Sequence, residues 1–469
     1  MSQQQTPKLS SSSSAIKHNQ LTTTSSKSVT NSHTNGNPHQ NSNNTSETQR
    51  RLLLTNPHLG QQRFTRKLPT LQITSHETTK HEPTLIFFLQ PSMGHFSTHF
   101  GHSIFTVLIF LICSCKARNP ALWNTSKVTS SSPAEVPAVF VFGDSTVDPG
   151  NNNYIGTIFT SNYAPYGRDL PNHIPTGRFS NGRLATDFIA SDLGVKGYVP
   201  PYLDPKLTAN ELITGVSFAS AGSGYDPYTA QLGGVITMQK QLEYFREYKA
   251  KVEKLVGKEK SRHIIETAAY IVSAGANDFV FNYYLPPLMS RRNFSVEQYK
   301  PFLLQIAQDF VQELWKEGAR KIGVVGLAPL GCLPMVITLN TKNIAQPRGC
   351  LKSPGLVVSS YNQQLQMKLN DIQNQLAVFD QRTKLFYLDI NTPTLSYIQD
   401  PATFGFEEVT RGCCGTGYLE LSFLCNPATI SCPDPSMYLF WDSIHPSQRT
   451  CRLVVDTFRP ALDEMKAST

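Results

Sequence analysis

Short apolar runs that end abruptly in small or polar residues recur along the C-terminal two thirds of the chain. Four of them are rich in β-branched or aromatic residues and are bounded by Gly, Asp or Asn: Val139–Phe142, Tyr270–Ser273, Ile322–Gly326 and Leu385–Leu388. An unbroken apolar run of this length is typical of a strand that is buried on both faces. The pattern therefore predicts four buried strands.

Between these runs the apolar residues follow the period of an amphipathic helix. Val296–Glu317 is the clearest case, and Gly318 ends it. Met238–Val256 and Leu356–Phe379 are predicted to be helices as well. Strands that alternate with long helices pair in parallel through right-handed crossovers. We therefore expect a single three-layer α/β/α domain with a central parallel sheet, of the flavodoxin-like type, over residues 135–469.

The first 92 residues show no such pattern. They are rich in Ser, Thr, Asn and Gln and poor in apolar residues, so burial cannot offset the entropy of ordering them, and we expect them to be disordered. Residues 1–117 hold ten Lys and Arg against three Glu, a net charge of +7 out of the chain's +8. The remaining chain is thus close to neutral and has no basic stripe, which argues against a nucleic-acid partner.

Residues 93–117 resemble a secretory signal peptide. The block Ile104–Cys113 is apolar, and small residues stand at the −3 and −1 positions of the cleavage site that follows it. The block is too short to span a bilayer, which takes ~20 residues. Because a signal peptide is read only at an N-terminus, we expect translation to start at Met93, with residues 1–92 an over-extension of the gene model. A genuine tail on a plastid-targeted or membrane-anchored protein is the alternative. Residues 118–134 would then form a linker.

Nine cysteines are present, and seven of them follow the predicted signal peptide. Six of the seven lie in loop-like sequence rich in Gly and Pro, as disulfides of a protein from an oxidising compartment do: Cys332, Cys350, Cys413, Cys414, Cys425 and Cys432. We expect the first two to close a local loop. The adjacent third and fourth are unsuited to pairing with each other, so the last two are their natural partners, in an order that the sequence leaves open.

The seventh cysteine, Cys451, lies in an apolar helical run and is predicted to be a buried free thiol. The cysteines do not show the C-x₂-C spacing of a zinc site, and we expect no metal or other cofactor. Asn124 and Asn293 each open a sequon for N-glycosylation. The cysteines and the sequons both favour a secreted protein of the extracellular space or cell wall.

Five residues could meet at the carboxyl ends of the strands, where open parallel sheets bind ligands. Ser145 follows the first strand and is predicted to open a helix whose dipole favours its ionised form. Gly222 lies in a loop of small residues whose backbone can approach a ligand closely, and Asn277 follows the second strand with an amide donor. Asp442 and His445 lie three residues apart. Together they offer a nucleophile, a base, an orienting carboxylate and oxyanion donors.

Each of these residues has an ordinary structural explanation when it is taken alone. Ser145 could be a helix cap, Gly222 a loop glycine, and Asn277 part of a turn. Asp442 and His445 could be a surface pair. No G-x-S-x-G elbow surrounds the serine. A metal-dependent phosphoesterase would need a cluster of Asp, His and Asn ligands, and the sequence offers only this one Asp-x-x-His pair.

Taken together, five successive blocks resemble those of the GDSL esterase/lipases, also called SGNH hydrolases: FGDSTVDPGNNN, FASAGSG, SAGAND, GLAPLGCLP and FWDSIHPS. Tyr166–Gly194 and Arg411–Pro446 resemble the plant secreted branch of that family. The resemblance extends from Val136 to the C-terminus, so residues 1–92 have no counterpart in it. A lone GDS carries little weight, whereas five blocks in order together with the cysteine-rich segment are specific.

The resemblance implies a mechanism with named roles. Ser145 would be the nucleophile, His445 the base that takes and returns its proton, and Asp442 the residue that orients the imidazole. The backbone N–H groups of Ser145 and Gly222 and the side chain of Asn277 would form the oxyanion hole. We therefore expect hydrolysis of a carboxylic ester through an acyl-serine intermediate, without metal or nucleotide.

The same resemblance leaves several alternatives. Gly224, two residues beyond Gly222, could be the oxyanion glycine instead. The family has Leu after the serine where this chain has Thr146, which should tune the site and not inactivate it, and Asp144 is expected to brace the turn. An acyltransferase would use the same Ser, His and Asp residues, and a secreted binding protein built on a catalytically retired hydrolase fold is a further alternative. The ester could be a lipid, an acetylated polysaccharide or a phenolic ester, and the oligomeric state is not specified.

Overall fold

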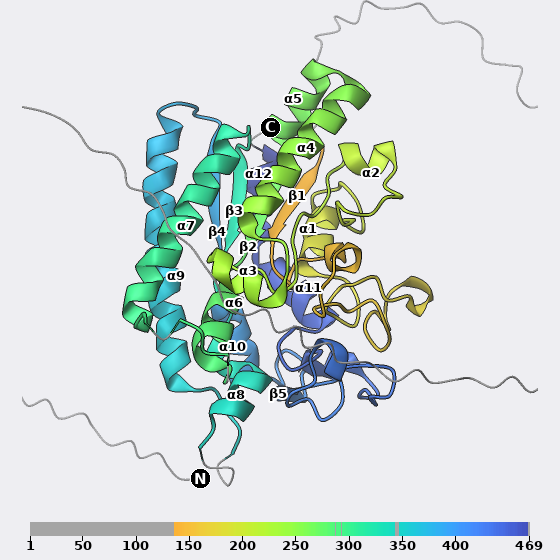
Figure 1. Ribbon diagram of the computed structural model, residues 1–469, viewed down its shortest axis with the longest axis vertical. Coiled ribbons are helices and arrows are strands. Elements are labelled where there is room, and N and C mark those ends of the chain that lie inside the picture. The colour runs from red at the N-terminus through yellow and green to blue at the C-terminus, as the bar shows by residue number, and fades with distance from the viewer. Residues whose placement is uncertain (1–135, 287, 292, 343–346, 468–469) are drawn as a thin grey trace, which may run out of the picture. The chain divides into compact units, whose positions relative to one another are not determined.

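The computed structural model describes residues 136–467 apart from positions 287, 292 and 343–346. Four predictions lie outside the described residues: the disordered extension, the signal peptide, the linker and the Asn124 sequon. The described chain is built around a parallel sheet with the order β1-β2-β3-β4 (Figure 1). The strands are β1 (Val139–Gly143), β2 (Ala269–Ser273), β3 (Lys321–Val325) and β4 (Lys384–Leu388).

Each predicted strand is present within one residue at either end. Every residue of β1, β2 and β3 is buried, whereas β4 is only partly buried at the edge of the sheet. The register pairs Phe140 with Tyr270, and all neighbouring strands run in parallel. The carboxyl ends of the strands therefore lie at one edge, which confirms the predicted central parallel sheet.

The outer edge of β1 is covered by a segment that the sequence did not predict to be extended. Val139 and Val141 donate backbone hydrogen bonds to the carbonyls of Thr214 and Val216 (both 3.2 Å). Ser220 then donates to the carbonyl of Gly143 at 3.0 Å. This pairing brings the small-residue loop that follows residue 220 beside the end of β1.

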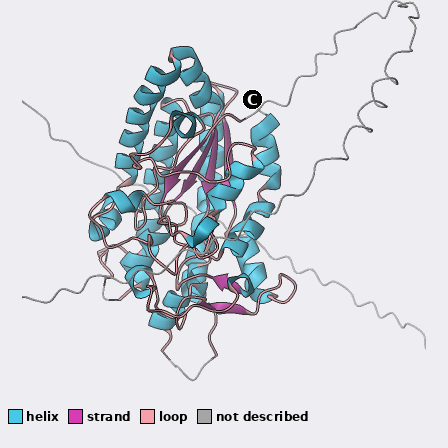
Figure 2. Cartoon of the chain, turned by 90° about the vertical axis from the view of Figure 1, so that its right-hand side faces the viewer, coloured by secondary structure: helices cyan, strands magenta, loops and turns pink. Residues whose placement is uncertain are grey.

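Helices cover both faces of the sheet, so the protein has the expected three-layer α/β/α fold (Figures 1 and 2). On one face α4, α7 and α9 pack against one another in sequence, and on the other α11 packs against α1, α10 and α12. The helices of these two layers are α4 (Met238–Val256), α7 (Val296–Lys316), α9 (Lys352–Ala377), α1 (Ala185–Asp192), α10 (Asn391–Gln399), α11 (Gln448–Thr457) and α12 (Arg459–Ala467). Five further helices are α2 (Ala209–Ile213), α3 (Pro227–Gly233), α5 (Lys258–Thr267), α6 (Ala276–Phe279) and α8 (Pro334–Asn340).

The predicted helices agree with this list except at their ends. The helix predicted over Met238–Val256 has those bounds, and α7 ends one residue before its prediction. α9 begins four residues earlier than predicted, at Lys352, and ends at Ala377. The start of α7 is fixed by a capping box, in which Ser295 and Gln298 each accept a backbone N–H of the other.

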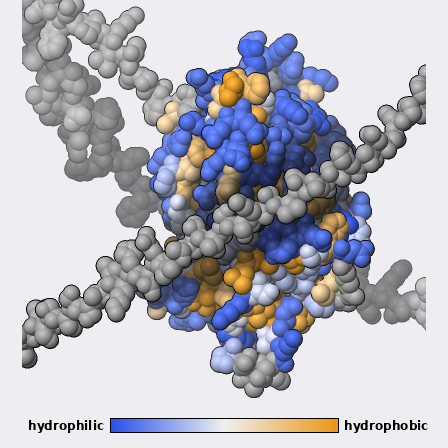
Figure 3. Space-filling model, turned by 90° about the vertical axis from the view of Figure 1, so that its left-hand side faces the viewer, coloured by the Kyte–Doolittle hydropathy of each residue, from blue (hydrophilic) through white to orange (hydrophobic). Residues whose placement is uncertain are grey.

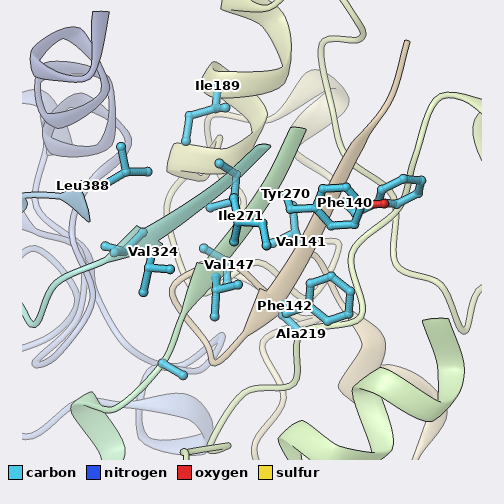
Figure 4. Packing of buried hydrophobic residues seen from close by; sticks show 14 of the residues in the cluster. Phe140, Val141, Phe142, Val147, Ile189, Ala219, Tyr270, Ile271, Val324 and Leu388 are labelled. Carbon is cyan, nitrogen blue, oxygen red and sulfur yellow. The ribbon is translucent and has the colours of Figure 1, made fainter. Parts of the chain in front are cut away.

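Aromatic side chains fill the interface between β1 and α4. The Phe140 ring lies 5.4 Å from that of Phe245 and 5.1 Å from that of Tyr248. Figure 4 shows Phe140 and Phe142 beside Tyr270 of the neighbouring strand. Because successive strand residues point to opposite faces, Ile271 faces the other layer. Figure 3 shows the outer face that carries α7 and α9, on which hydrophilic side chains prevail in the upper part and apolar ones gather below.

Three disulfides tie the loops at the carboxyl end of the sheet. They join Cys332 to Cys350, Cys413 to Cys432 and Cys414 to Cys425. The two bridges of the adjacent cysteines hold the segment between β5 (Glu408–Gly412) and β6 (Tyr438–Phe440), which pair in a second, two-stranded sheet. Cys451 is a buried free thiol as predicted, and burial raises its pKa to about 12.

Candidate active site

Ser145 follows a tight turn at the end of β1. Gly143 has φ +143°, and a Cβ there would lie 1.9 Å from the carbonyl oxygen of Ser273. Only glycine therefore permits the close approach of β1 to the end of β2. Ser145 lies in the turn that follows, which is closed by the Val147 N–H donating to the Asp144 carbonyl at 3.2 Å.

The predicted helix at Ser145 is wrong. The next helical element is the 3₁₀ turn Asn151–Tyr154, six residues further on. Pro149 disfavours helical geometry at the residue before it, and Gly150 has φ +133°. Ser145 therefore receives no helix dipole.

His445 joins Ser145 to Asp442 through hydrogen bonds at both ring nitrogens. Its Nε2 lies 2.7 Å from Ser145 Oγ, and its Nδ1 lies 2.8 Å from Asp442 Oδ2. All three residues are less than 8% exposed. Asp442 Oδ1 also accepts the backbone N–H of Ile444 and of His445. The structure thus brings together the three residues that the sequence singled out, although 300 positions separate the serine from the histidine.

Tyr166 is a further partner of the carboxylate, and sequence reasoning missed it. Its hydroxyl donates to Asp442 Oδ2 at 2.7 Å and accepts the backbone N–H of Ser422 at 2.9 Å. Burial and the neighbouring carboxylate hold the pKa of Tyr166 well above its usual range, so the hydroxyl keeps its proton. The only signal in the sequence was its place at the start of the YGRDLP stretch.

A small pocket of about 20 Å³ lies at the Ser145–His445 pair, and both Gly222 and Asn277 line it. The Asn277 amide is oriented by one hydrogen bond, from Nδ2 to the Ser223 carbonyl at 2.8 Å. Gly224 does not line this pocket, because it packs against Asp278, whose Oδ1 would lie 2.3 Å from an added Cβ. Of the two candidate glycines, Gly222 is the one beside the serine.

Two buried carboxylates brace the loops around this pocket, and neither was recognised in the sequence. Asp148 accepts the backbone N–H groups of Gly150 and Ala221, at 2.8 and 2.9 Å, and so ties the turn after β1 to the Gly222 loop. Asp278 accepts the N–H of Tyr225 at 2.8 Å and the hydroxyl of Thr229 at 2.6 Å. Burial raises the pKa of Asp148 to about 6 and that of Asp278 to about 7, against the effect of these hydrogen bonds.

Asp144 and Thr146 form a closed hydrogen-bonded turn on either side of Ser145. Asp144 Oδ1 accepts both the Thr146 N–H (3.0 Å) and the Thr146 hydroxyl (2.7 Å). The Thr146 hydroxyl also lies 3.0 Å from Ser273 Oγ at the end of β2. A leucine at position 146 could make neither side-chain contact, so the threonine adds a polar tie between the turn and the sheet.

Within the described ranges, no three His, Cys, Asp or Glu side chains come together as a metal site requires. The same part of the chain holds no helix that is both long enough and apolar enough to cross a membrane.

Residues 139–458 match the family model described as GDSL-like Lipase/Acylhydrolase. This match covers well over half of the chain, and the chain belongs to the GDSL lipase/acylhydrolase family, a class whose α/β/α fold is the one described above. A GDSL esterase/lipase of Arabidopsis thaliana is 55% identical over 333 residues, which cover 71% of this chain and 88% of the relative. A second from the same plant is 47% identical over 315 residues, 67% of this chain and 86% of the relative. The protein is a carboxylic ester hydrolase of the plant branch.

Proposed function

We propose that the protein is a secreted serine esterase that cleaves acyl esters of lipids or of cell-wall components through an acyl-serine intermediate. The observation that carries this proposal is the hydrogen-bonded series Ser145 Oγ, His445 Nε2 (2.7 Å), His445 Nδ1 and Asp442 Oδ2 (2.8 Å). It supplies a nucleophile, a base and an orienting carboxylate in the relation that serine hydrolases require.

In this mechanism His445 takes the Ser145 proton at Nε2 while Oγ attacks the ester carbonyl carbon. The imidazolium is stabilised by Asp442, which accepts its Nδ1–H. Collapse of the tetrahedral intermediate breaks the bond to the alcohol, and His445 returns the proton to the leaving oxygen. Water then attacks the acyl-serine with the same histidine as base, which releases the acid and restores Ser145.

The oxyanion of the tetrahedral intermediate would be held by three donors. The backbone N–H groups of Ser145 and Gly222 donate to no other group in the described part of the chain, so both are available to a ligand. Asn277 uses one amide proton on the Ser223 carbonyl and keeps the other for the substrate. Donors that are already oriented cost no reorganisation when the negative charge develops.

Secretion is supported by the disulfides and by one exposed sequon. Disulfides persist in oxidising compartments, and three are present in the described residues. Asn293 is exposed in the loop before α7, where an oligosaccharide transferase could reach it. The N-terminal segment that resembles a signal peptide completes this proposal.

A serine-directed fluorophosphonate tests the proposed mechanism. The probe is expected to add one phosphonyl group per chain, and peptide mapping is expected to place it on Ser145, because only that serine is activated by His445. Hydrolysis of a nitrophenyl ester should be lost in parallel with labelling. Ser223, a buried serine of the neighbouring loop, serves as internal control and should stay unmodified. An unlabelled protein, or a label on another serine, would contradict the proposal.

Tyr166→Phe should lower kcat/KM for a short-chain ester roughly tenfold, since it removes a hydrogen bond to a charged group. Without that donor the negative charge of Asp442 is less compensated, so it stabilises the imidazolium of His445 more strongly. The acidic limb of the pH profile of kcat/KM is therefore expected to move to higher pH. Tyr163→Phe is the matched control, because the Tyr163 hydroxyl donates to the Thr160 carbonyl. An unmoved acidic limb in Tyr166→Phe would show a purely structural role.

A further inference from the structure

An apolar cavity of about 120 Å³ lies directly behind the candidate active site. Four of the residues that line it are chain neighbours of the nucleophile, the oxyanion amide and the base: Thr146, Ala276, Ile444 and Pro446. Ile444 lines both this cavity and the small pocket at Ser145, and so forms a wall common to the two. The cavity and the pocket at Ser145 are therefore neighbours that share this aliphatic side chain.

The cavity is larger than the pocket that holds the reacting groups. At about 20 Å³ the pocket at Ser145 has room for little more than one water-sized group. It can hold the carbonyl group of an ester but not the acyl chain or the alcohol as well. The hydrocarbon of an ester extends beyond this pocket, and the apolar cavity on the other side of Ile444 is next to it.

The lining of the cavity is apolar along its length. None of its lining residues, all within the described part of the chain, is charged. The hydroxyl of Thr450 is already committed to the Leu439 carbonyl at 2.6 Å, and that of Thr146 to Asp144. A polar ligand would therefore find few hydrogen-bond partners in the cavity, whereas a hydrocarbon gives up no hydrogen bonds when it leaves water.

The cavity is also elongated. One wall follows a single face of α11, from Thr450 through Val454 to Phe458 just beyond the helix end, a rise of roughly 12 Å at 1.5 Å per residue. Ile189 of α1 and Ile271 of β2 line it as well, and Figure 4 shows these two side chains in the core around β2. A long, narrow apolar space fits an unbranched chain better than a ring or a sugar.

We propose that this cavity binds the unbranched acyl chain of a medium-chain ester, with Ile444 as the side chain that must turn aside to admit it. This inference rests on the function proposed above and adds the acyl subsite. An apolar cavity of about 150 Å³ accommodates benzene, so 120 Å³ takes roughly four to six carbons beyond the carbonyl. Acyl groups of about five to seven carbons, the carbonyl carbon included, fill the cavity, and an acetyl group leaves it empty.

A series of nitrophenyl esters from acetyl to dodecanoyl tests the acyl subsite, because the alcohol stays the same throughout. Each methylene that enters the cavity should raise kcat/KM about fourfold, up to about hexanoyl, and longer acyl chains should bring no further increase. Val454 is 5% exposed and lines the cavity. Val454→Phe, which fills it, should lower the hexanoyl-to-acetyl ratio of kcat/KM at least tenfold.

Two further variants keep this test decisive. Val454→Ala enlarges the cavity and should move the optimum one or two carbons towards longer chains, which covers the case in which the phenylalanine prevents folding. Leu453→Phe is the matched control, because Leu453 lines a different surface hollow and not this cavity. Its chain-length profile should equal that of the wild type.

The outcomes separate this inference from the proposed function. If both Val454 variants keep the wild-type chain-length profile while their thermal stability changes, the cavity is only a packing void and the inference is overturned. That outcome would not contradict the proposed ester hydrolysis. If the wild-type protein cleaves no ester of any length, the proposed function fails and the acyl subsite fails with it.

Discussion

Ser145→Ala is expected to lower kcat/KM for a short-chain nitrophenyl ester by roughly 10⁴- to 10⁶-fold, the loss that follows removal of a triad serine. The hydroxyl of Ser145 has His445 as its hydrogen-bond partner, and the hydroxyls of Thr146 and Ser273 nearby are bonded to each other. No second nucleophile therefore replaces it. Steady-state kinetics with a purified variant measure the effect.

The fold should survive this substitution, because it removes one hydroxyl and no packing group. The melting temperature of Ser145→Ala is expected to stay within a few degrees of that of the wild type. Ser443→Ala is the matched control: Ser443 is buried in the loop that carries His445, and its hydroxyl has no hydrogen-bond partner in the described structure. A variant at position 145 that retained turnover would exclude the acyl-serine mechanism.

Asp442→Asn is expected to lower kcat about 10⁴-fold with the fold intact. Both carboxylate oxygens accept hydrogen bonds, Oδ1 from the backbone N–H groups of Ile444 and His445 and Oδ2 from the hydroxyl of Tyr166. An asparagine must direct its NH₂ group against one of these donors or against Nδ1–H of the imidazole. The ring of His445 would then turn or take the wrong tautomer.

The comparison with Asp434→Asn isolates this effect. Asp434 lies on the same segment, is exposed, and accepts the backbone N–H of Ser436 without touching the site. Its replacement should leave kcat within a factor of about two, the range of ordinary surface substitutions. A loss of less than tenfold in Asp442→Asn would show that Asp442 does not orient the base.

The four strands of the sheet and the helices α4, α7 and α9 could be predicted because their burial is reflected in the order of apolar and polar residues. Residues of β1 to β3 are buried on both faces, which leaves an unbroken apolar run, and α7 buries one stripe. The segment that covers β1 between residues 214 and 220 escaped prediction because small residues separate its two large apolar ones, Val216 and Phe218, and its pairing with β1 is made by backbone hydrogen bonds. Local pattern carries no trace of such pairing.

The residues of the candidate site likewise include some that the sequence could indicate and some that it could not. The sequence could indicate Ser145, His445 and Asp442 because their residue types and their order along the chain fit the chemistry of a serine hydrolase. The surrounding blocks also resemble a known family. The contact of Tyr166 with Asp442 joins residues 276 positions apart, so no local pattern could indicate it. The helix expected at Ser145 is absent because Pro149 restricts the backbone and Gly150 adopts a φ of +133°, so the chain turns here and does not continue into a helix.

The distance of 300 residues between Ser145 and His445 has a consequence for the timing of activity. A ribosome that adds 5–20 residues per second needs roughly 15 to 60 s to proceed from the serine to the histidine. During that interval the growing chain carries a serine without a base. The proposed site is therefore incomplete during this interval. Hydrolysis can begin only after synthesis is nearly complete and the segment with Asp442 and His445 has folded against Ser145.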